Sequence, residues 1–208
     1  MSRNTVKPAS AERAATEKRA RTRRIVLRAA VDCIAEKGVA GATAAEIARR
    51  CGLSWGVIQY HFGDRLGLFL ALLESSTESL ARAFADLEST HPRLPDRVRA
   101  LVEGTWALVA SDRYRVMLEI ELQLGRDAAH EAQVGKYARR ARSKFLETWR
   151  KALPECPPSR VDDAAQLAIA ALRGLALERA VEGSRSSKKP RREIVLGSVL
   201  VILGLDDA

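Results

Sequence analysis

The sequence has few aromatic residues, few cysteines and no long apolar run, and each shortage excludes a class of protein. Aromatic residues make up 5% of the 208 residues. The three cysteines, Cys33, Cys51 and Cys156, are odd in number and far apart, so they indicate neither a disulfide framework nor a zinc site. The longest apolar run, 194–205, is far shorter than the ~20 residues of a membrane-spanning helix. Because the N-terminus is polar and charged rather than signal-like, we expect a cytoplasmic protein with no membrane partner.

Histidine is also scarce, which argues against an enzyme. His61, His91 and His130 stand alone in the chain, whereas catalysis requires a nucleophile, a base or a metal cluster that converge. Residues 52–56 match G-x-S-x-G, the nucleophile elbow of α/β-hydrolases, but that motif needs a strand before the serine and here a capped helix precedes it. We therefore expect no catalytic residue, no metal site and no cofactor.

The positive charge that the chain does carry is concentrated near its N-terminus. The formal net charge is +9, and residues 1–65 hold 13 Lys or Arg against 6 Asp or Glu. Residues 66–208 hold 22 against 20. A basic N-terminal segment is the pattern expected for contacts with phosphate, although a basic solubilising tail explains residues 3–18 equally well.

Residues 42–65 predict two short helices joined by a tight turn, with a third helix directly after them. Thr43 and Glu46 have the spacing of a capping box, which starts a helix. Gly52 ends that helix, and Ser54 caps the second one. Two helices joined by a turn of about three or four residues that contains glycine form a helix-turn-helix motif. The second helix of that motif can lie in the major groove of DNA.

These residues resemble the signature of a known family. Residues 52–62, GLSWGVIQYHF, followed by Asp64, Arg65 and an apolar helix, resemble TetR-family transcriptional regulators. The resemblance covers residues 22–73 closely and the rest of the chain only in its helical pattern.

The resemblance implies an all-α protein with two domains. An N-terminal three-helix helix-turn-helix domain at 21–65 would bind DNA. A larger C-terminal helical domain at 66–208 would bind an effector and dimerise. Residues 1–20 lack apolar periodicity, so we expect a disordered basic arm there.

The two faces of the second helix have different expected roles. Val57, Ile58 and Phe62 are expected to pack inward. On the outer face, Gln59 has the donor and acceptor for a bidentate contact with adenine, and Trp55 suits a thymine methyl or a sugar. The commonest family form has Tyr where Gln59 stands, so the base preference of relatives does not transfer.

Other candidates for contact with DNA come from the ends of the motif. Arg24 belongs to an arginine cluster on the first helix, Arg65 matches a position that reaches phosphate in the family, and His61 is assigned equally to DNA and to packing. The complete candidate set is Arg24, Thr43, Ser54, Trp55, Gly56, Gln59, Tyr60, His61 and Arg65.

Helices expected between residues 96 and 152 resemble the ligand-binding core of the family. A glutamate such as Glu121 in an apolar stretch would meet a cationic or hydroxylated ligand, or it would face solvent or pair with an arginine. Ordinary core packing is the alternative for each aromatic residue. The candidates for an effector pocket are Trp106, Tyr114, Met117, Glu121, Phe145 and Trp149.

The last two helices are the expected dimer interface. Residues 161–181 are rich in alanine, and residues 194–203 are apolar nearly all round, so the final helix must be covered by a partner or by the chain's own core. In the family, the corresponding pair forms a four-helix interface. The implied interface residues are Ala168, Leu172, Leu175, Val195, Val199 and Ile202.

The sequence thus predicts a homodimeric repressor that a small-molecule effector releases from a palindromic DNA operator. Its expected partners are double-stranded DNA, a second copy of the chain and an unidentified effector. Two alternatives stay open, namely a DNA-binding regulator without small-molecule control and a helical protein–protein adaptor.

Overall fold

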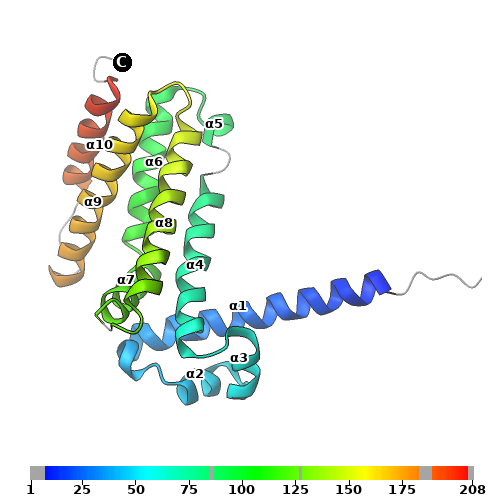
Figure 1. Cartoon of the computed structure of the whole chain (residues 1–208). Coiled ribbons are helices and arrows are strands. Elements are labelled where there is room, and N and C mark those ends of the chain that lie inside the picture. Colours follow the sequence, from blue (N-terminus) through cyan, green and yellow to red (C-terminus); the bar gives the residue numbers. More distant parts are fainter. Residues whose placement is uncertain (1–7, 85–86, 127, 183–188, 206–208) are drawn as a thin grey trace, which may run out of the picture. The chain divides into compact units, whose positions relative to one another are not determined.

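The computed structural model describes residues 8–84, 87–126, 128–182 and 189–205, and these residues form an all-α protein without strands (Figure 1). The expected fold class is therefore confirmed. No helix in these ranges is both long and apolar enough to cross a membrane. The helices are α1 Pro8–Gly41, α2 Ala44–Cys51, α3 Trp55–Phe62, α4 Arg65–Ala83, α5 Leu87–Thr90, α6 Leu94–Val109, α7 Asp112–Leu124, α8 Glu131–Ala152, α9 Pro158–Glu182 and α10 Lys189–Leu203.

The chain divides into two compact units, Met1–Leu72 and Leu73–Ala208. The division falls inside α4, whereas the sequence placed it at the start of that helix, between residues 65 and 66. Phe69 and Leu72 on the first half of α4 are buried, so this half belongs to the core of the smaller unit. The two units are described separately below.

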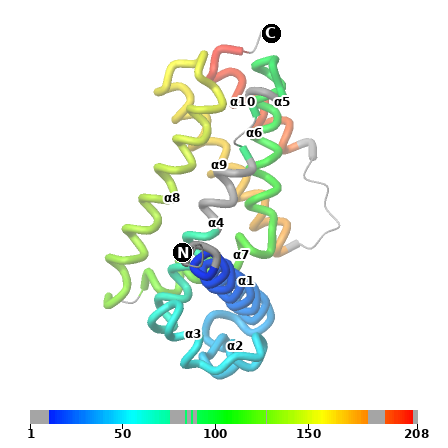
Figure 2. The backbone as a smooth tube through the Cα atoms, turned by 90° about the vertical axis from the view of Figure 1, so that its right-hand side faces the viewer, coloured from blue at the N-terminus to red at the C-terminus, as the bar shows by residue number. Residues whose placement is uncertain are grey.

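The smaller unit is held together by the apolar faces of three short helical segments. Val26 and Ala30 of α1, Ile47 of α2 and Ile58 of α3 are completely buried. Figure 2 shows the backbones of α2 and α3 beside that of α1. Full burial of an aliphatic side chain contributes about 1.5–3 kcal/mol to folding, so a few such residues provide most of the stability of this small core. α2 and α3 are thereby fixed against α1.

The caps predicted from the sequence are confirmed. The Thr43 hydroxyl accepts a hydrogen bond from the Glu46 amide at 3.3 Å, and the Ser54 hydroxyl accepts one from the Val57 amide at 3.4 Å. Gly52 ends α2 with φ 64°, in the left-handed region that other residues rarely adopt. Local chemistry therefore sets both ends of the turn between α2 and α3.

The predicted disordered arm is wrong for residues 8–20, because α1 begins at Pro8. Side chains 11–20 are exposed, so this part of the helix makes no apolar contact that would show as periodicity. It consists mostly of Ala, Glu, Lys and Arg, which are strong helix formers without burial. Residues 1–7 lie outside the described part of the chain. At the other end of α1, Gly38 interrupts the helix with φ 70°.

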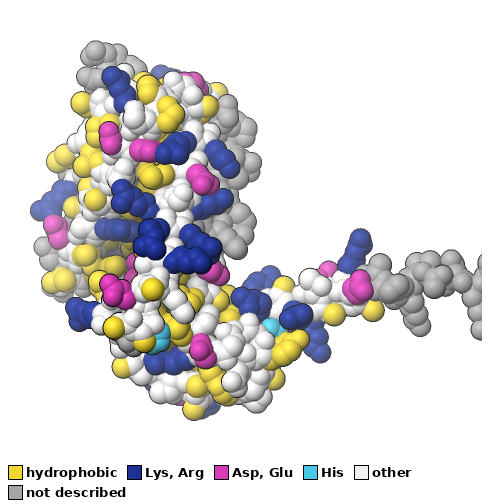
Figure 3. All heavy atoms as spheres, in the orientation of Figure 1, with side chains coloured by type: hydrophobic (Ala, Val, Ile, Leu, Met, Phe, Trp, Pro, Cys, Tyr) yellow, Lys and Arg dark blue, Asp and Glu magenta, His cyan; other side chains and the backbone are white. Residues whose placement is uncertain are grey.

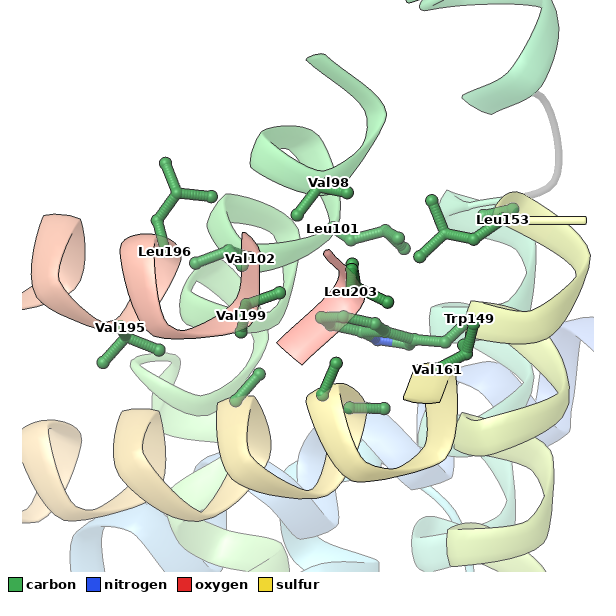
Figure 4. Close-up of a cluster of buried hydrophobic side chains, with 14 of the residues drawn as sticks. Val98, Leu101, Val102, Trp149, Leu153, Val161, Val195, Leu196, Val199 and Leu203 are labelled. Atoms are coloured by element: carbon green, nitrogen blue, oxygen red, sulfur yellow. The ribbon is translucent and has the colours of Figure 1, made fainter. Parts of the chain in front are cut away.

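The larger unit is built around α9, which packs against α6, α8 and α10. Its core contains Trp149, a fully buried residue of α8. Figure 4 shows that side chains from α6 and α10 meet beside the Trp149 ring, with residues of α9 closing the cluster. Core residues of this unit are therefore contributed by helices that are distant in sequence.

The residues predicted at the dimer interface lie inside this core instead. Ala168, Leu172 and Val199 are fully buried within one chain, Leu175 and Val195 are nearly so, and Ile202 is half-buried against the core. That prediction is corrected, because a helix that is apolar all round buries one side in its own chain and leaves the other side exposed. The large apolar residues that α9 and α10 expose are Leu167, Leu177, Val181, Ile194 and Val201.

All three cysteines are free and shielded. Cys33 and Cys156 are buried, and the half-buried Cys51 donates its thiol proton to the Ile47 carbonyl oxygen at 2.8 Å. Burial raises the pKa of each of the three thiols. These cysteines therefore behave as small core residues.

Candidate DNA-binding surface and ligand cavity

Helix α3 presents a polar outer face on a buried anchor. Ile58 is completely buried, while Gly56, Gln59 and Tyr60 are exposed, with Tyr60 at 71%. Val57 is 39% exposed, so its predicted inward packing is wrong. A helix of eight residues in contact with one neighbouring surface has room for about one buried row, and Ile58 occupies it.

Of the remaining candidates, Thr43, Ser54 and Arg24 are exposed, whereas Trp55 is not. Ser54 and Thr43 each use the hydroxyl as a helix cap, so their first role is to fix the motif. Trp55 is half-buried at the N-terminus of α3, and Arg24 is exposed on α1. The N-terminal turn of a helix favours anions because its amide groups are unpaired and its dipole is positive there.

Two arginines of α1 surround the C-terminal end of α3. Arg23 donates a hydrogen bond to the His61 carbonyl oxygen at 2.6 Å, and its guanidinium lies 4.5 Å from the Phe62 ring centroid. The Arg19 guanidinium lies 5.4 Å from the ring centroid of Tyr60. Partial burial, and then the charges of both arginines, lower the pKa of His61. These effects favour the neutral form of His61, which lies near the C-terminal end of α3.

Arg19 was not among the candidate residues, and Arg23 was considered only as a member of the arginine cluster on the first helix. The available signal was their spacing of four residues, which places them on one face of a helix. That signal was lost because Arg19 fell in the segment predicted to be disordered.

The Glu46 carboxylate joins α2 to α1. It contacts Lys37 at 2.9 Å, Arg49 at 2.8 Å and Arg50 at 2.9 Å, and Arg50 also reaches Glu36 at 2.5 Å. Hydrogen bonds from Arg49, Lys37 and Arg50 hold the pKa of Glu46 well below its usual range. Only half of the expected capping box is formed, because this carboxylate binds cations and the Thr43 amide bonds to the Gly41 carbonyl oxygen.

Arg65 has a structural position, so its assignment as a phosphate ligand is corrected. Its Nε donates to the Ala42 carbonyl oxygen at 3.1 Å, and a terminal nitrogen donates to the Val39 carbonyl oxygen. The guanidinium also lies 4.9 Å from the Phe69 ring centroid. A charged donor satisfies carbonyl groups that the end of α1 leaves unpaired. Sequence spacing cannot reveal this role, because these partners are more than 20 residues away in the chain.

The larger unit contains a cavity of about 370 Å³ between α7, α8 and α9. Four of the six predicted pocket residues line it, namely Tyr114, Met117, Glu121 and Phe145. Its other lining residues are Leu108, Tyr137, Ala138, Ala141, Arg142, Leu146, Gln166, Ile169 and Arg173.

The two predicted tryptophans do not line the cavity, and their assignment to the pocket is corrected. Trp149 is completely buried in the core, one turn beyond Phe145 on the same face of α8. Trp106 is half-buried on α6, and the Arg192 guanidinium lies 5.0 Å from its ring centroid. Helical spacing identified the correct face of α8 but gave no sign of where the cavity ends along it.

The polar groups of the cavity come mainly from residues that the sequence did not single out. Arg142 on α8 donates a hydrogen bond to the Gln166 side-chain oxygen on α9. The Arg173 guanidinium, also on α9, lies 5.4 Å from the Tyr114 ring centroid. Burial raises the pKa of Glu121, and the charge of Arg173 opposes that rise. In the described ranges, no group of three or more His, Cys, Asp or Glu residues has the arrangement of a metal site.

Comparison with known proteins identifies the family. Residues 26–72, from α1 to the first half of α4, match the family model of bacterial regulatory proteins of the tetR family. The transcriptional regulator BetI of Stenotrophomonas maltophilia is 30% identical over 182 residues, which cover 84% of this chain and 89% of that protein. The chain belongs to the TetR family. It is thus a DNA-binding transcriptional regulator, like its TetR-family relatives.

Solved structures of transcriptional regulators share the fold of most of this chain. A transcriptional regulator from a Rhodococcus species has a TM-score of 0.67 at 22% identity, with 89% of this chain and 98% of that chain covered. FadR of Bacillus subtilis, solved in complex with stearoyl-CoA, has a TM-score of 0.67 at 16% identity, with 88% and 98% covered. At these identities the likeness establishes the fold alone.

Proposed function

We propose that this protein is a cytoplasmic homodimeric repressor whose α3 helices read a palindromic operator and whose release from DNA is caused by a small molecule in the cavity. The observation that supports this most strongly is the exposed polar face of α3 on a capped helix-turn-helix. The proposal assigns no catalytic step, metal or cofactor to the chain.

Base readout is assigned to the outer face of α3. The exposed side-chain amide of Gln59 offers one donor and one acceptor, which match the N7 and N6 groups of adenine in the major groove. Trp55, Gly56 and Tyr60 lie on the same short helix and are assigned to sugar, methyl and phosphate contacts. Each good bidentate contact provides about 1–3 kcal/mol of discrimination between bases.

Phosphate contacts are assigned to the basic residues beside α3. Arg24 is exposed on α1. Arg19 and Arg23 also belong to α1, and they contact the C-terminal end of α3. Such contacts position a protein on DNA but carry no sequence information directly, so they are expected to weaken uniformly with salt.

Dimerisation is assigned to the outer faces of α9 and α10. Ile194 is 68% exposed and Val201 is 59% exposed, and a spacing of seven residues places them on one side of α10. Exposed apolar residues grouped in this way are typical of a protein interface. Two-fold symmetry would then require operator half-sites separated by about 34–36 Å, or a multiple of that distance.

Effector control is assigned to the cavity of the larger unit. Its volume of about 370 Å³ lies in the range of small-molecule sites, about 300–1,000 Å³. A ligand that favours one arrangement of the dimer would change DNA affinity by a coupling free energy of about 1–3 kcal/mol. The cavity is the observation that favours this function over a regulator without an effector.

Fluorescence anisotropy with the purified protein and a labelled duplex tests the proposal. We expect sequence-selective binding to the DNA upstream of its own gene, or to a duplex enriched from a random pool, with affinity that falls as salt rises. Gln59→Ala should remove about 1–3 kcal/mol of selectivity over a scrambled duplex.

The matched control is Gln133→Ala, which removes an exposed glutamine from α8. It should leave both affinity and selectivity unchanged. Failure of the wild-type protein to bind any duplex at low salt, even after selection from the random pool, would refute the proposal in favour of the adaptor.

A further inference from the structure

The cavity has an apolar floor and a basic mouth. Met117, Tyr137 and Phe145 are each at least nine-tenths buried, and they supply aliphatic and aromatic surface inside it. Arg142 and Arg173 are exposed and belong to the same lining. A ligand that fits this arrangement has an apolar body and one polar end that stays near solvent.

Both guanidiniums have hydrogen-bond donors to spare. Within the described ranges, neither Arg142 nor Arg173 forms an ion pair with a carboxylate. Arg142 is engaged by the neutral Gln166 side chain, and Arg173 by the Tyr114 ring. Because a guanidinium carries five N–H groups in a planar fork, each has the geometry for a bidentate bond to a carboxylate or phosphate.

The charge around the mouth favours an anion over a cation. Arg139 lies one helical turn before Arg142 on α8, and Figure 3 shows Lys and Arg side chains gathered over this part of the larger unit. A cleft bordered by one sign of charge raises the local concentration of ligands of opposite sign.

The groups inside the cavity are also unsuited to an organic cation. Among the residues that the structure describes, Glu121 is the one carboxylate that lines it, and burial favours the uncharged form of this residue. The Tyr114 ring, a potential cation–π partner, already lies against the Arg173 guanidinium. A bound ammonium would thus meet two positively charged guanidiniums and a single carboxyl group whose charged form is disfavoured by burial.

We propose that the effector is an amphipathic organic anion, with its apolar body against Met117, Tyr137 and Phe145 and its anionic group between Arg142 and Arg173. This inference rests on the proposed effector control of the same site. Because burial favours the uncharged form of Glu121, this residue adds no fixed negative charge that would repel the anion.

Calorimetric titration without DNA tests the ligand class directly. The probes are decanoate, decanol and decyltrimethylammonium, which share an apolar chain and differ in the charge of the head group, all used below their micelle concentrations. We expect decanoate to bind at one site per chain, more tightly than decanol, and decyltrimethylammonium to bind most weakly.

Variants then locate the bound anion. The double variant Arg142→Gln, Arg173→Gln should lose at least about tenfold in decanoate affinity, because charge-assisted hydrogen bonds are lost. Arg140→Gln makes the same charge change on α8 at a residue outside the lining, and it should change the affinity by less than about twofold. Glu121→Gln, which keeps the side chain uncharged, should leave decanoate affinity nearly unchanged, and Ala141→Trp should abolish binding by filling the cavity.

Three results would overturn the inference. They are tighter binding of decyltrimethylammonium than of decanoate, binding of none of the three probes, and unchanged decanoate affinity in the double variant. Anisotropy with the operator separates this inference from the proposed function, since the double variant should bind DNA like the wild-type protein but no longer be released by decanoate. Loss of DNA binding in the wild-type protein would instead count against the regulator itself.

Discussion

At the scale of single residues, charged side chains of the smaller unit hold the motif together. Glu46 binds cations from α1 and α2, and Arg65 donates to carbonyl groups at the end of α1. Both residues lie in the segment that matches the family model. Residues in a DNA-binding motif can therefore be essential to it without touching DNA, which is the opposite of the role assigned to Arg65 from the sequence.

Replacement of Arg65 tests this structural role. Arg65→Met keeps an unbranched chain over Phe69 but removes the donors to Ala42 and Val39, so the free energy of unfolding should fall by about 1–3 kcal/mol. Urea denaturation followed by circular dichroism measures the change. Arg28→Met, an equivalent change at an exposed position of α1, should cost less than about 0.5 kcal/mol.

The result also decides between the two roles of Arg65. Unchanged stability together with a large loss of operator affinity would restore the phosphate contact. A loss of stability with near-normal DNA affinity at low temperature is the result that the structure leads us to expect.

At the scale of elements, α1 is longer than the motif requires. Its first turns expose Arg13 and Lys18, and further along the same helix Arg19 and Arg23 contact α3. A continuous helix holds its side chains at fixed positions, whereas a disordered arm would have to lose conformational entropy on binding. We therefore infer that the N-terminal half of α1 extends the phosphate-binding surface beyond the motif.

Neutralisation of the exposed part of α1 tests that extension. In the double variant Arg13→Gln, Lys18→Gln, operator affinity should fall, and the slope of log affinity against log salt should become shallower by nearly two if both residues contact phosphate. Base selectivity should be unchanged, because these contacts carry no sequence information.

The matched control for α1 removes two positive charges from the larger unit. Lys136→Gln, Lys151→Gln changes two exposed lysines of α8. An equal decrease of slope in this control would assign the effect to net charge instead of to α1.

At the scale of the whole molecule, the outer faces of α9 and α10 form the dimer interface that we propose. Five large apolar residues on these two helices are exposed in a single chain. Their buried neighbours belong to the chain's own core, so changes at the two kinds of position should have different effects. Loss of a buried leucine destabilises the fold, whereas a change on the outer face affects association alone.

A lysine on the outer face of α10 tests the dimer. Val201→Lys should convert the protein to a monomer in sedimentation velocity while its helix content stays unchanged, because a charge would be buried at the interface without a partner. Leu122→Lys changes a residue of α7 with nearly the same exposure, 57% against 59%, and it should leave the dimer intact. A dimeric Val201→Lys protein would place the interface elsewhere.

The helix-turn-helix motif was predictable because its signals are local. Thr43, Gly52 and Ser54 act on backbone groups within a few residues, so their chemistry is visible in the sequence. The extension of α1 was missed because helix propensity was given less weight than apolar periodicity.

The cavity and the interface were less predictable, since they depend on which helices meet. Arg173 reaches the cavity from α9, and nothing near it in sequence indicates that α7 lies opposite. Leu172 and Val199 are apolar in the way that both a core and an interface require. The sequence shows that such residues must be covered, but not whether their own chain or a partner chain covers them.

The shielding of the three native cysteines makes the protein suitable for distance measurements by spin labelling. A buried thiol with a raised pKa reacts slowly with labelling reagents, because the thiolate is the reactive form. A cysteine introduced at exposed Arg28 on α1 would thus be labelled selectively, without prior removal of the native ones. Pulsed electron spin resonance on the dimer then reports the separation of the two motifs directly, with and without a ligand.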